Sequence, residues 1–81
     1  MSRTAAELEG ALARVGRARP FRAEGVVRRA VGLAVESDGP PASLGEECLL
    51  LGADGETLSR AQVVGFSGSR VFTMPVERRE D

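Results

Sequence analysis

Closely spaced turn signals are the feature that most constrains how this sequence can fold. Three of them interrupt the chain: Asp38-Gly39-Pro40-Pro41, Ala53-Asp54-Gly55-Glu56 and Ser67-Gly68-Ser69. Asp-Gly suits a tight hairpin turn because glycine adopts positive φ without steric cost. Two successive prolines exclude regular strand pairing and predict a loop. The segments between these turns are rich in valine and leucine, so the chain from residue 21 on is predicted to form short strands.

A small closed antiparallel β-barrel over residues 21–77 is the fold that these strands predict. The first strand, residues 24–36, is long and is expected to bend at Gly32. The last strand alternates so that Phe72, Met74 and Val76 share one face, and the aromatic rings are expected in the core. Closure would hide the sheet edges that a small open sheet exposes. The shorter strands are predicted at residues 46–51, 58–66 and 70–76.

The first 20 residues predict a short amphipathic helix ahead of the barrel. Thr4 and Glu7 have the spacing of a capping box, and Gly16 and Pro20 mark the exit from a helix that runs to about Arg17. An apolar stripe follows the helical spacing i, i+4, i+7. The stripe could pack on its own domain or dock on a partner, and docking is favoured because the predicted barrel looks complete without it. The stripe consists of Leu8, Leu12 and Val15.

Charge is unevenly distributed along a chain whose formal net charge is -1. Residues 1–35 sum to +4, residues 36–57 to -6, and residues 58–81 to +1. The basic segment could attract phosphate or anionic lipid. The chain has only 3 aromatic residues, all Phe, and single-strand binding needs several exposed rings, so nucleic acid is not expected as a partner. Arg28 and Arg29 could grip a partner's carboxylates or could belong to an ordinary exposed strand; both interpretations stay open.

The composition excludes several kinds of chemistry. Without histidine and with a single cysteine, the chain cannot build the usual zinc sites, a Ser-His-Asp triad or an internal disulfide. Without lysine it cannot form a P-loop. Cys48 is expected to be a small buried hydrophobe, and the acidic residues around the proline loop are expected to be solvated. We predict no catalytic, cofactor-binding or metal-binding residues. With no signal peptide and no long apolar run, a cytosolic location is expected.

Four segments in order resemble one protein family. They are Glu24 to Glu36, Gly39 to Cys48, Ala61-Gln62-Val63-Val64-Gly65-Phe66, and Val71-Phe72-Thr73-Met74-Pro75. Together they resemble the N-terminal barrel of the flagellar and type III secretion export ATPases, which are related to the α and β subunits of the rotary ATP synthases. Gly-Pro-Pro in the loop leans toward the flagellar member over the virulence-type member.

The resemblance implies that this chain is a non-catalytic N-terminal piece of a hexameric ATPase that drives protein export, although a natural 81-residue chain stays open. ATP and Mg²⁺ would bind in a catalytic domain outside this sequence, so no cofactor is expected here. The implied partners are a stator-like regulator, further copies in a hexamer, and an anionic membrane surface. The implied location is cytoplasmic, peripheral to the inner membrane at the export apparatus.

The predicted organisation is therefore a docking helix at residues 1–20, a barrel at residues 21–77 and a charged tail at residues 78–81. In this hypothesis the helix offers its apolar stripe to the regulator while arginines add charge attraction. A stand-alone barrel of the oligonucleotide-binding type and a helix that lies on a membrane surface are the alternatives. The predicted partner-binding residues are Leu8, Leu12, Val15, Arg14, Arg17 and Arg19.

Overall fold

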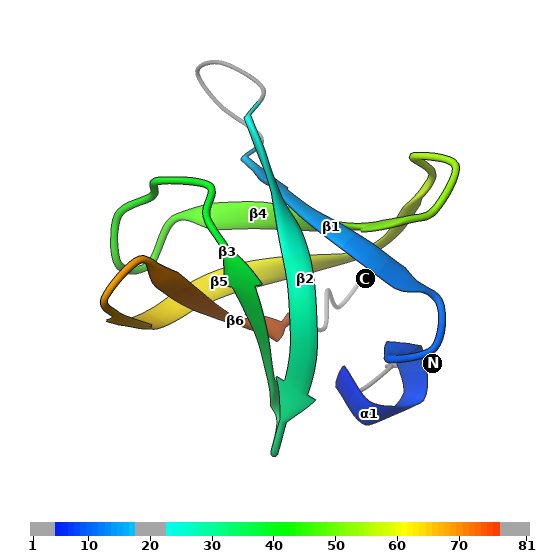
Figure 1. Ribbon diagram of the computed structural model, residues 1–81, viewed down its shortest axis with the longest axis horizontal. Helices are drawn as coiled ribbons and strands as arrows, with labels where there is room; N and C mark the ends of the chain where they lie inside the picture. The colour runs from blue at the N-terminus through cyan, green and yellow to red at the C-terminus, as the bar shows by residue number, and fades with distance from the viewer. Residues whose placement is uncertain (1–4, 18–22, 77–81) are drawn as a thin grey trace, which may run out of the picture.

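Six antiparallel strands close into a barrel in the computed structural model, which describes residues 5–17 and 23–76 (Figure 1). Around the barrel the strands follow the order β1-β2-β3-β6-β5-β4, and β4 pairs back with β1. The prediction of a mostly β, closed antiparallel barrel is confirmed. The elements are α1 (Ala5–Leu8), β1 (Leu12–Arg17), β2 (Glu24–Val31), β3 (Ala34–Asp38), β4 (Glu47–Gly52), β5 (Thr57–Ser67) and β6 (Arg70–Pro75).

The N-terminal helix is much shorter than predicted. Within the described residues, α1 is a single turn of four residues, residues 9–11 form a turn, and the remainder of the predicted helix is the strand β1. Val15 of β1 lies opposite Gly25 of β2 and opposite Leu50 of β4, so this strand joins the two ends of the sheet. Pairing on both sides outweighs a marginal helix propensity, because a short isolated helix gains little stability. The barrel thus begins at Leu12, ahead of the predicted boundary at residue 20.

The long first strand of the prediction is a hairpin. The backbone reverses at Gly32, whose φ is 61°, so that Val31 pairs with Ala34 and Ala30 pairs with Val35. A positive φ costs glycine nothing, which is why a tight turn forms where a bend was expected. The three later strands match their predicted positions within a few residues. The predicted tail, residues 78–81, lies outside the described residues.

Small and branched apolar side chains fill the barrel. Val35, Leu50 and Val63 are each no more than 1% exposed, and Leu8 of α1 packs into the same cluster. On β6 the side chains that face the core are Val71 and Thr73. The expectation that the aromatic rings fill the core was wrong for this reason: β6 has the opposite parity, which leaves Phe72 half-buried, and Phe66 of β5 is exposed.

The loop between β3 and β4 is held tightly against the barrel. A Cβ atom on Gly25 would lie 2.1 Å from the carbonyl oxygen of Gly39, so the backbones of β2 and the loop approach as closely as they do only because residue 25 is glycine. Further along, Gly45 and Val63 are joined by a backbone hydrogen bond of 2.8 Å. The loop therefore has a fixed position beside the β5–β6 turn, at the left of Figure 1.

Candidate functional site

The apolar stripe predicted to dock on a partner lies mostly inside the barrel. Leu8 is 1% exposed and Val15 is fully buried, and both belong to the core cluster. Leu12 is half-buried and packs against that cluster. A partner could reach Leu8 and Val15 only if the barrel opened. The sequence allowed the stripe either to pack on its own domain or to dock on a partner. In the structure these side chains pack on their own domain.

The predicted arginines differ in their surroundings. The Arg14 side chain is 53% exposed, and its Nη1 lies 3.6 Å from a carboxylate oxygen of Glu24 on the neighbouring strand. Arg17 donates a 2.8 Å hydrogen bond from Nε to Glu46 and is only 26% exposed. Arg19 lies outside the described residues. Of the described pair, Arg14 is the one that a partner could contact from solvent.

A charged cluster that the sequence did not predict lies on the outer face of β2, β3 and β6. At its centre Glu36, 5% exposed, accepts hydrogen bonds from Arg29 Nε at 2.8 Å and from Arg70 Nη1 at 2.5 Å. Arg70 also bridges to Asp38 at 2.7 Å, and Arg28 approaches Asp38 at 3.4 Å. We call these five residues the charged cluster. It ties three strands together through side chains.

The charged cluster holds its central carboxylate in the ionised form. The hydrogen bond from Arg29 is the main reason that the pKa of Glu36 lies below its ordinary value, and Arg70 lowers it further, while burial acts in the opposite direction. The same hydrogen bond raises the pKa of Arg29. Both shifts favour the charged forms of Glu36 and Arg29.

A second ion pair fixes the end of the β3–β4 loop. Glu46 accepts a 2.9 Å hydrogen bond from the backbone N–H of Ser43 as well as the one from Arg17. These two contacts, the Ser43 N–H first, lower the pKa of Glu46. Burial, with the nearby Glu46 carboxylate adding, raises the pKa of Cys48 to about 11. Cys48 is thus a buried neutral thiol, as predicted, and is not positioned as a nucleophile.

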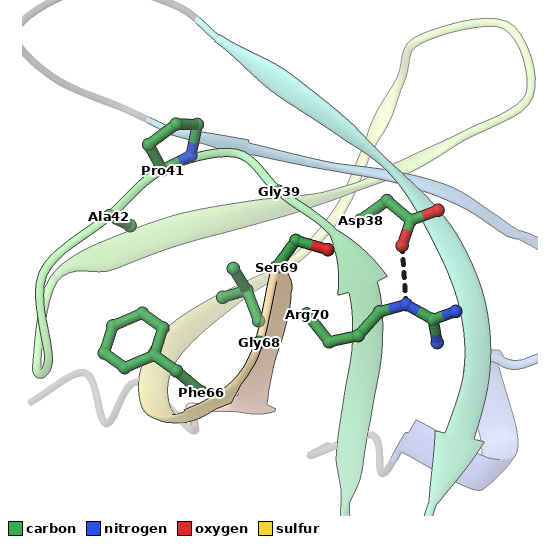
Figure 2. A pocket seen from close by; sticks show the side chains of 9 residues that line it. Asp38, Gly39, Pro41, Ala42, Phe66, Gly68, Ser69 and Arg70 are labelled. Carbon is green, nitrogen blue, oxygen red and sulfur yellow. Dashed lines mark ion pairs between the residues drawn. The ribbon is translucent and has the colours of Figure 1, made fainter.

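A hollow of about 570 Å³ opens between the β3–β4 loop and the β5–β6 turn. In the view of Figure 2, the apolar side chains lie to one side and the Asp38–Arg70 ion pair to the other. Phe66, on the apolar side, is 49% exposed. We call this space the hollow; its wall includes Asp38, Pro41, Ala42, Phe66, Arg70 and Val71.

Neither the charged cluster nor the hollow could be read from local patterns. Arg70 and Glu36 are 34 residues apart in sequence, and only the pairing of β3 with β6 brings them together. The hollow combines a loop after β3 with the turn after β5. The one available signal was that Arg28 and Arg29 occupy adjacent positions on a strand, which marked them as candidates for binding carboxylates.

The charged side chains of the described residues form ion pairs and no metal site. None of their Cys, Asp and Glu side chains gather in a group that could hold a metal ion. Every arginine among them lies within 4 Å of a carboxylate oxygen, at distances from 2.5 to 3.6 Å. In the described part of the chain, no helix has both the length and the apolar character needed to cross a bilayer.

Comparison with known proteins identifies relatives of the same region. Residues 27–80 match the family model described as ATP synthase alpha/beta family, beta-barrel domain. The chain is 39% identical over 57 residues to the flagellum-specific ATP synthase of Bacillus subtilis. It is 42% identical over 55 residues to the protein of the same name from Pseudomonas aeruginosa, and 39% identical over 61 residues to the one from Salmonella typhimurium.

The aligned regions are a large part of this chain and a small part of its relatives. They cover 68%, 65% and 73% of this chain, in the order given, but only 13%, 12% and 13% of the relatives. No solved structure matches the chain significantly.

Proposed function

Because this chain belongs to the ATP synthase alpha/beta family, through the β-barrel domain that its residues 27–80 match, we propose that it is the non-catalytic N-terminal barrel of a flagellar protein-export ATPase. The observation that carries the proposal is the coincidence of that match with a closed six-stranded barrel. The identity of 39% to 42% to three flagellum-specific ATP synthases supports the flagellar member over the virulence-type member.

ATP hydrolysis is proposed to belong to a longer protein and not to the barrel itself. The chain spans 12–13% of the length of the relatives it matches. It has no lysine, so it cannot form a P-loop, in which a lysine contacts the terminal phosphates. In this proposal the barrel contributes to assembly of a hexamer, and ATP and Mg²⁺ bind elsewhere in the protein.

The proposed regulator contact lies at the exposed side of the barrel's N-terminal strand. The buried positions of Leu8 and Val15 argue against them as contacts, because they stabilise the barrel itself. Arg14 is 53% exposed, and its 3.6 Å contact with Glu24 leaves other N–H groups of the guanidinium able to bind a carboxylate of a partner. The proposed setting is the cytoplasmic side of the inner membrane, at the export apparatus, with the anionic membrane surface as a further contact.

A chimera tests the proposal. The barrel of the Bacillus subtilis flagellum-specific ATP synthase is replaced by residues 5–76 of this chain, and hexamer formation and swimming motility are measured. We expect both to be retained, since the barrels share a family and a fold. The matched control carries Leu8→Asp in the same chimera and should lose both, because a carboxylate cannot be buried in the core without a partner.

A chimera that is folded and hydrolyses ATP but neither assembles nor supports motility would contradict the proposal. The virulence-type alternative is tested by the same replacement in a virulence-type export ATPase, where the flagellar assignment predicts weaker function. Arg14→Glu in the flagellar chimera should weaken co-purification of the regulator while the hexamer remains. Undiminished co-purification would remove Arg14 from the proposed contact.

The oligonucleotide-binding alternative has less support. A single-strand binder presents several aromatic rings on one face. Among the described residues Phe66 is exposed, while Phe72 is half-buried. The described arginines are also engaged by carboxylates of the same chain. A gel shift with single-stranded DNA that weakens with salt would revive this alternative.

A further inference from the structure

The hollow leaves an aromatic ring exposed where burial would be favourable. Phe66 lies opposite Val71 in the β5–β6 pair, so their side chains are on the same face of the sheet, and Pro41 and Ala42 of the β3–β4 loop line the same hollow. The space of about 570 Å³ falls within the range typical of ligand pockets. It is large enough to take an apolar side chain together with the backbone on either side of it.

Positive charge is in excess in the charged cluster, which shares Asp38 and Arg70 with the wall of the hollow. The charged cluster contains the guanidinium groups of Arg28, Arg29 and Arg70, but only two carboxylates. The Arg28, Arg29 and Arg70 side chains are 50%, 67% and 35% exposed, the Asp38 side chain is 43% exposed, and the Glu36 side chain is only 6% exposed. A guanidinium group has five N–H donors, and the contacts described use one or two of them on each arginine. The face that solvent meets therefore offers donors and net positive charge.

Both halves of the hollow are held in position before any ligand arrives. The Arg70 guanidinium is held by two carboxylates: its Nη1 contacts Glu36 and its Nε contacts Asp38. On the other wall, the loop is bonded to β5 through Gly45 and Val63. A site whose groups are already ordered loses less conformational entropy on binding than a mobile one.

We propose that the hollow binds an acidic peptide segment of a partner protein, which anchors one large apolar side chain against Phe66 and places its carboxylates beside Arg28 and Arg70. Charge complementarity selects this occupant, because a basic peptide would be repelled by the surplus guanidinium charge. A second copy of this chain is the competing occupant, because Leu44 is 68% exposed and precedes Glu46 and Glu47 in the sequence; the test below separates the two.

The test is a selection of short random peptides displayed on phage against the full chain. We expect the enriched peptides to combine Asp or Glu with a neighbouring Leu, Phe or Met. A synthetic peptide from the selection is then titrated against three variants whose folding is verified by thermal unfolding. Phe66→Ser should lower affinity at least about tenfold, as expected for an aromatic anchor. Arg28→Gln should weaken binding less and reduce its dependence on salt.

Leu33→Ser is the matched control, because Leu33 is a 61% exposed apolar residue in the β2–β3 turn, which does not line the hollow. It should bind like the wild type. Enrichment of basic peptides, no enrichment, or equal binding by Phe66→Ser would each overturn the proposal. So would self-association of the chain that Phe66→Ser abolishes, since a second copy would then be the occupant. The assay uses only this chain, so its failure would leave the proposed role in the export ATPase untouched.

Discussion

At the scale of single residues, Glu36 shows how a carboxylate can be nearly enclosed on the outside of a small barrel. Glu36 lies opposite Arg29 on β2 and opposite Phe72 on β6. Arg70, two residues before Phe72 on β6, also reaches its carboxylate. Two guanidinium groups compensate for the water that the carboxylate has lost. The ionised Glu36 carboxylate therefore helps to hold β3 between β2 and β6, because it bonds an arginine on each of these two strands.

The lowered pKa of Glu36 predicts how stability depends on pH. A carboxyl group whose pKa is lower in the folded state stabilises the fold above its unfolded pKa, and this stabilisation is lost as pH falls through the folded pKa. We expect Glu36→Gln to be less stable than the wild type at pH 7, with a smaller loss of stability on acidification. Urea unfolding at pH 7 and at about pH 3 measures both. Glu47→Gln, which changes an exposed pair with Arg60, is the control and should lower the free energy of unfolding at pH 7 by less than Glu36→Gln does.

Thr73 differs from Glu36, because its buried hydroxyl group has no hydrogen-bond partner in the described part of the chain. Its side chain is fully buried, and Oγ1 has no hydrogen-bond partner among the described residues. We expect Thr73→Val to stabilise the barrel by about 1 kcal/mol, because it removes an unsatisfied hydroxyl at nearly constant volume. The thermal midpoint should rise by roughly 4–8 °C. Thr73→Ser retains the hydroxyl and loses the methyl group, so it should lower the midpoint; stabilisation by Ser would refute this explanation.

At the scale of elements, the strands after Gly45 were predictable and β1 was not. Turn signals such as Asp54-Gly55 are local, so they mark β4, β5 and β6 in the sequence. The stripe of Leu8, Leu12 and Val15 satisfies a helical spacing, and nothing local distinguishes it from a strand. What decides is pairing with β2, the next strand along the chain, and with β4, whose pairing with β1 closes the barrel. The hollow and the charged cluster escaped prediction for the same reason.

The two interpretations of α1 differ in what Leu8 contributes. If Leu8 were a docking residue, its truncation would leave stability unchanged. Because it is 1% exposed and belongs to the core cluster, we expect Leu8→Ala to cost about 2–5 kcal/mol. Leu44→Ala, at a residue that is 68% exposed, should cost less than about 0.5 kcal/mol. Chemical unfolding of both variants measures the difference in the free energy of unfolding. Equal stabilities would contradict a core role for Leu8 and support the docking interpretation.

At the scale of the whole molecule, the barrel neutralises a charge asymmetry that dominates the sequence. Residues 1–35 carry +4 and residues 36–57 carry -6, and the basic segment was expected to attract phosphate or anionic lipid. Antiparallel closure instead places Arg17 beside Glu46, Arg29 beside Glu36 and Arg28 beside Asp38. Within the described residues, the charged cluster has one more guanidinium group than carboxylates.

Closure also means that β1 should be indispensable to the barrel. Removal of residues 1–17 would leave β2 and β4 without their shared neighbour, and both would expose unpaired backbone groups. It would also remove Leu8 and Val15 from the core. We expect the truncated chain to lose the cooperative unfolding transition seen by circular dichroism and to aggregate on size-exclusion chromatography. Removal of residues 1–4 leaves every described strand in place and should preserve the transition. A chain that starts at residue 18 and still unfolds cooperatively as a monomer would show that β1 is dispensable, as the docking-helix hypothesis required.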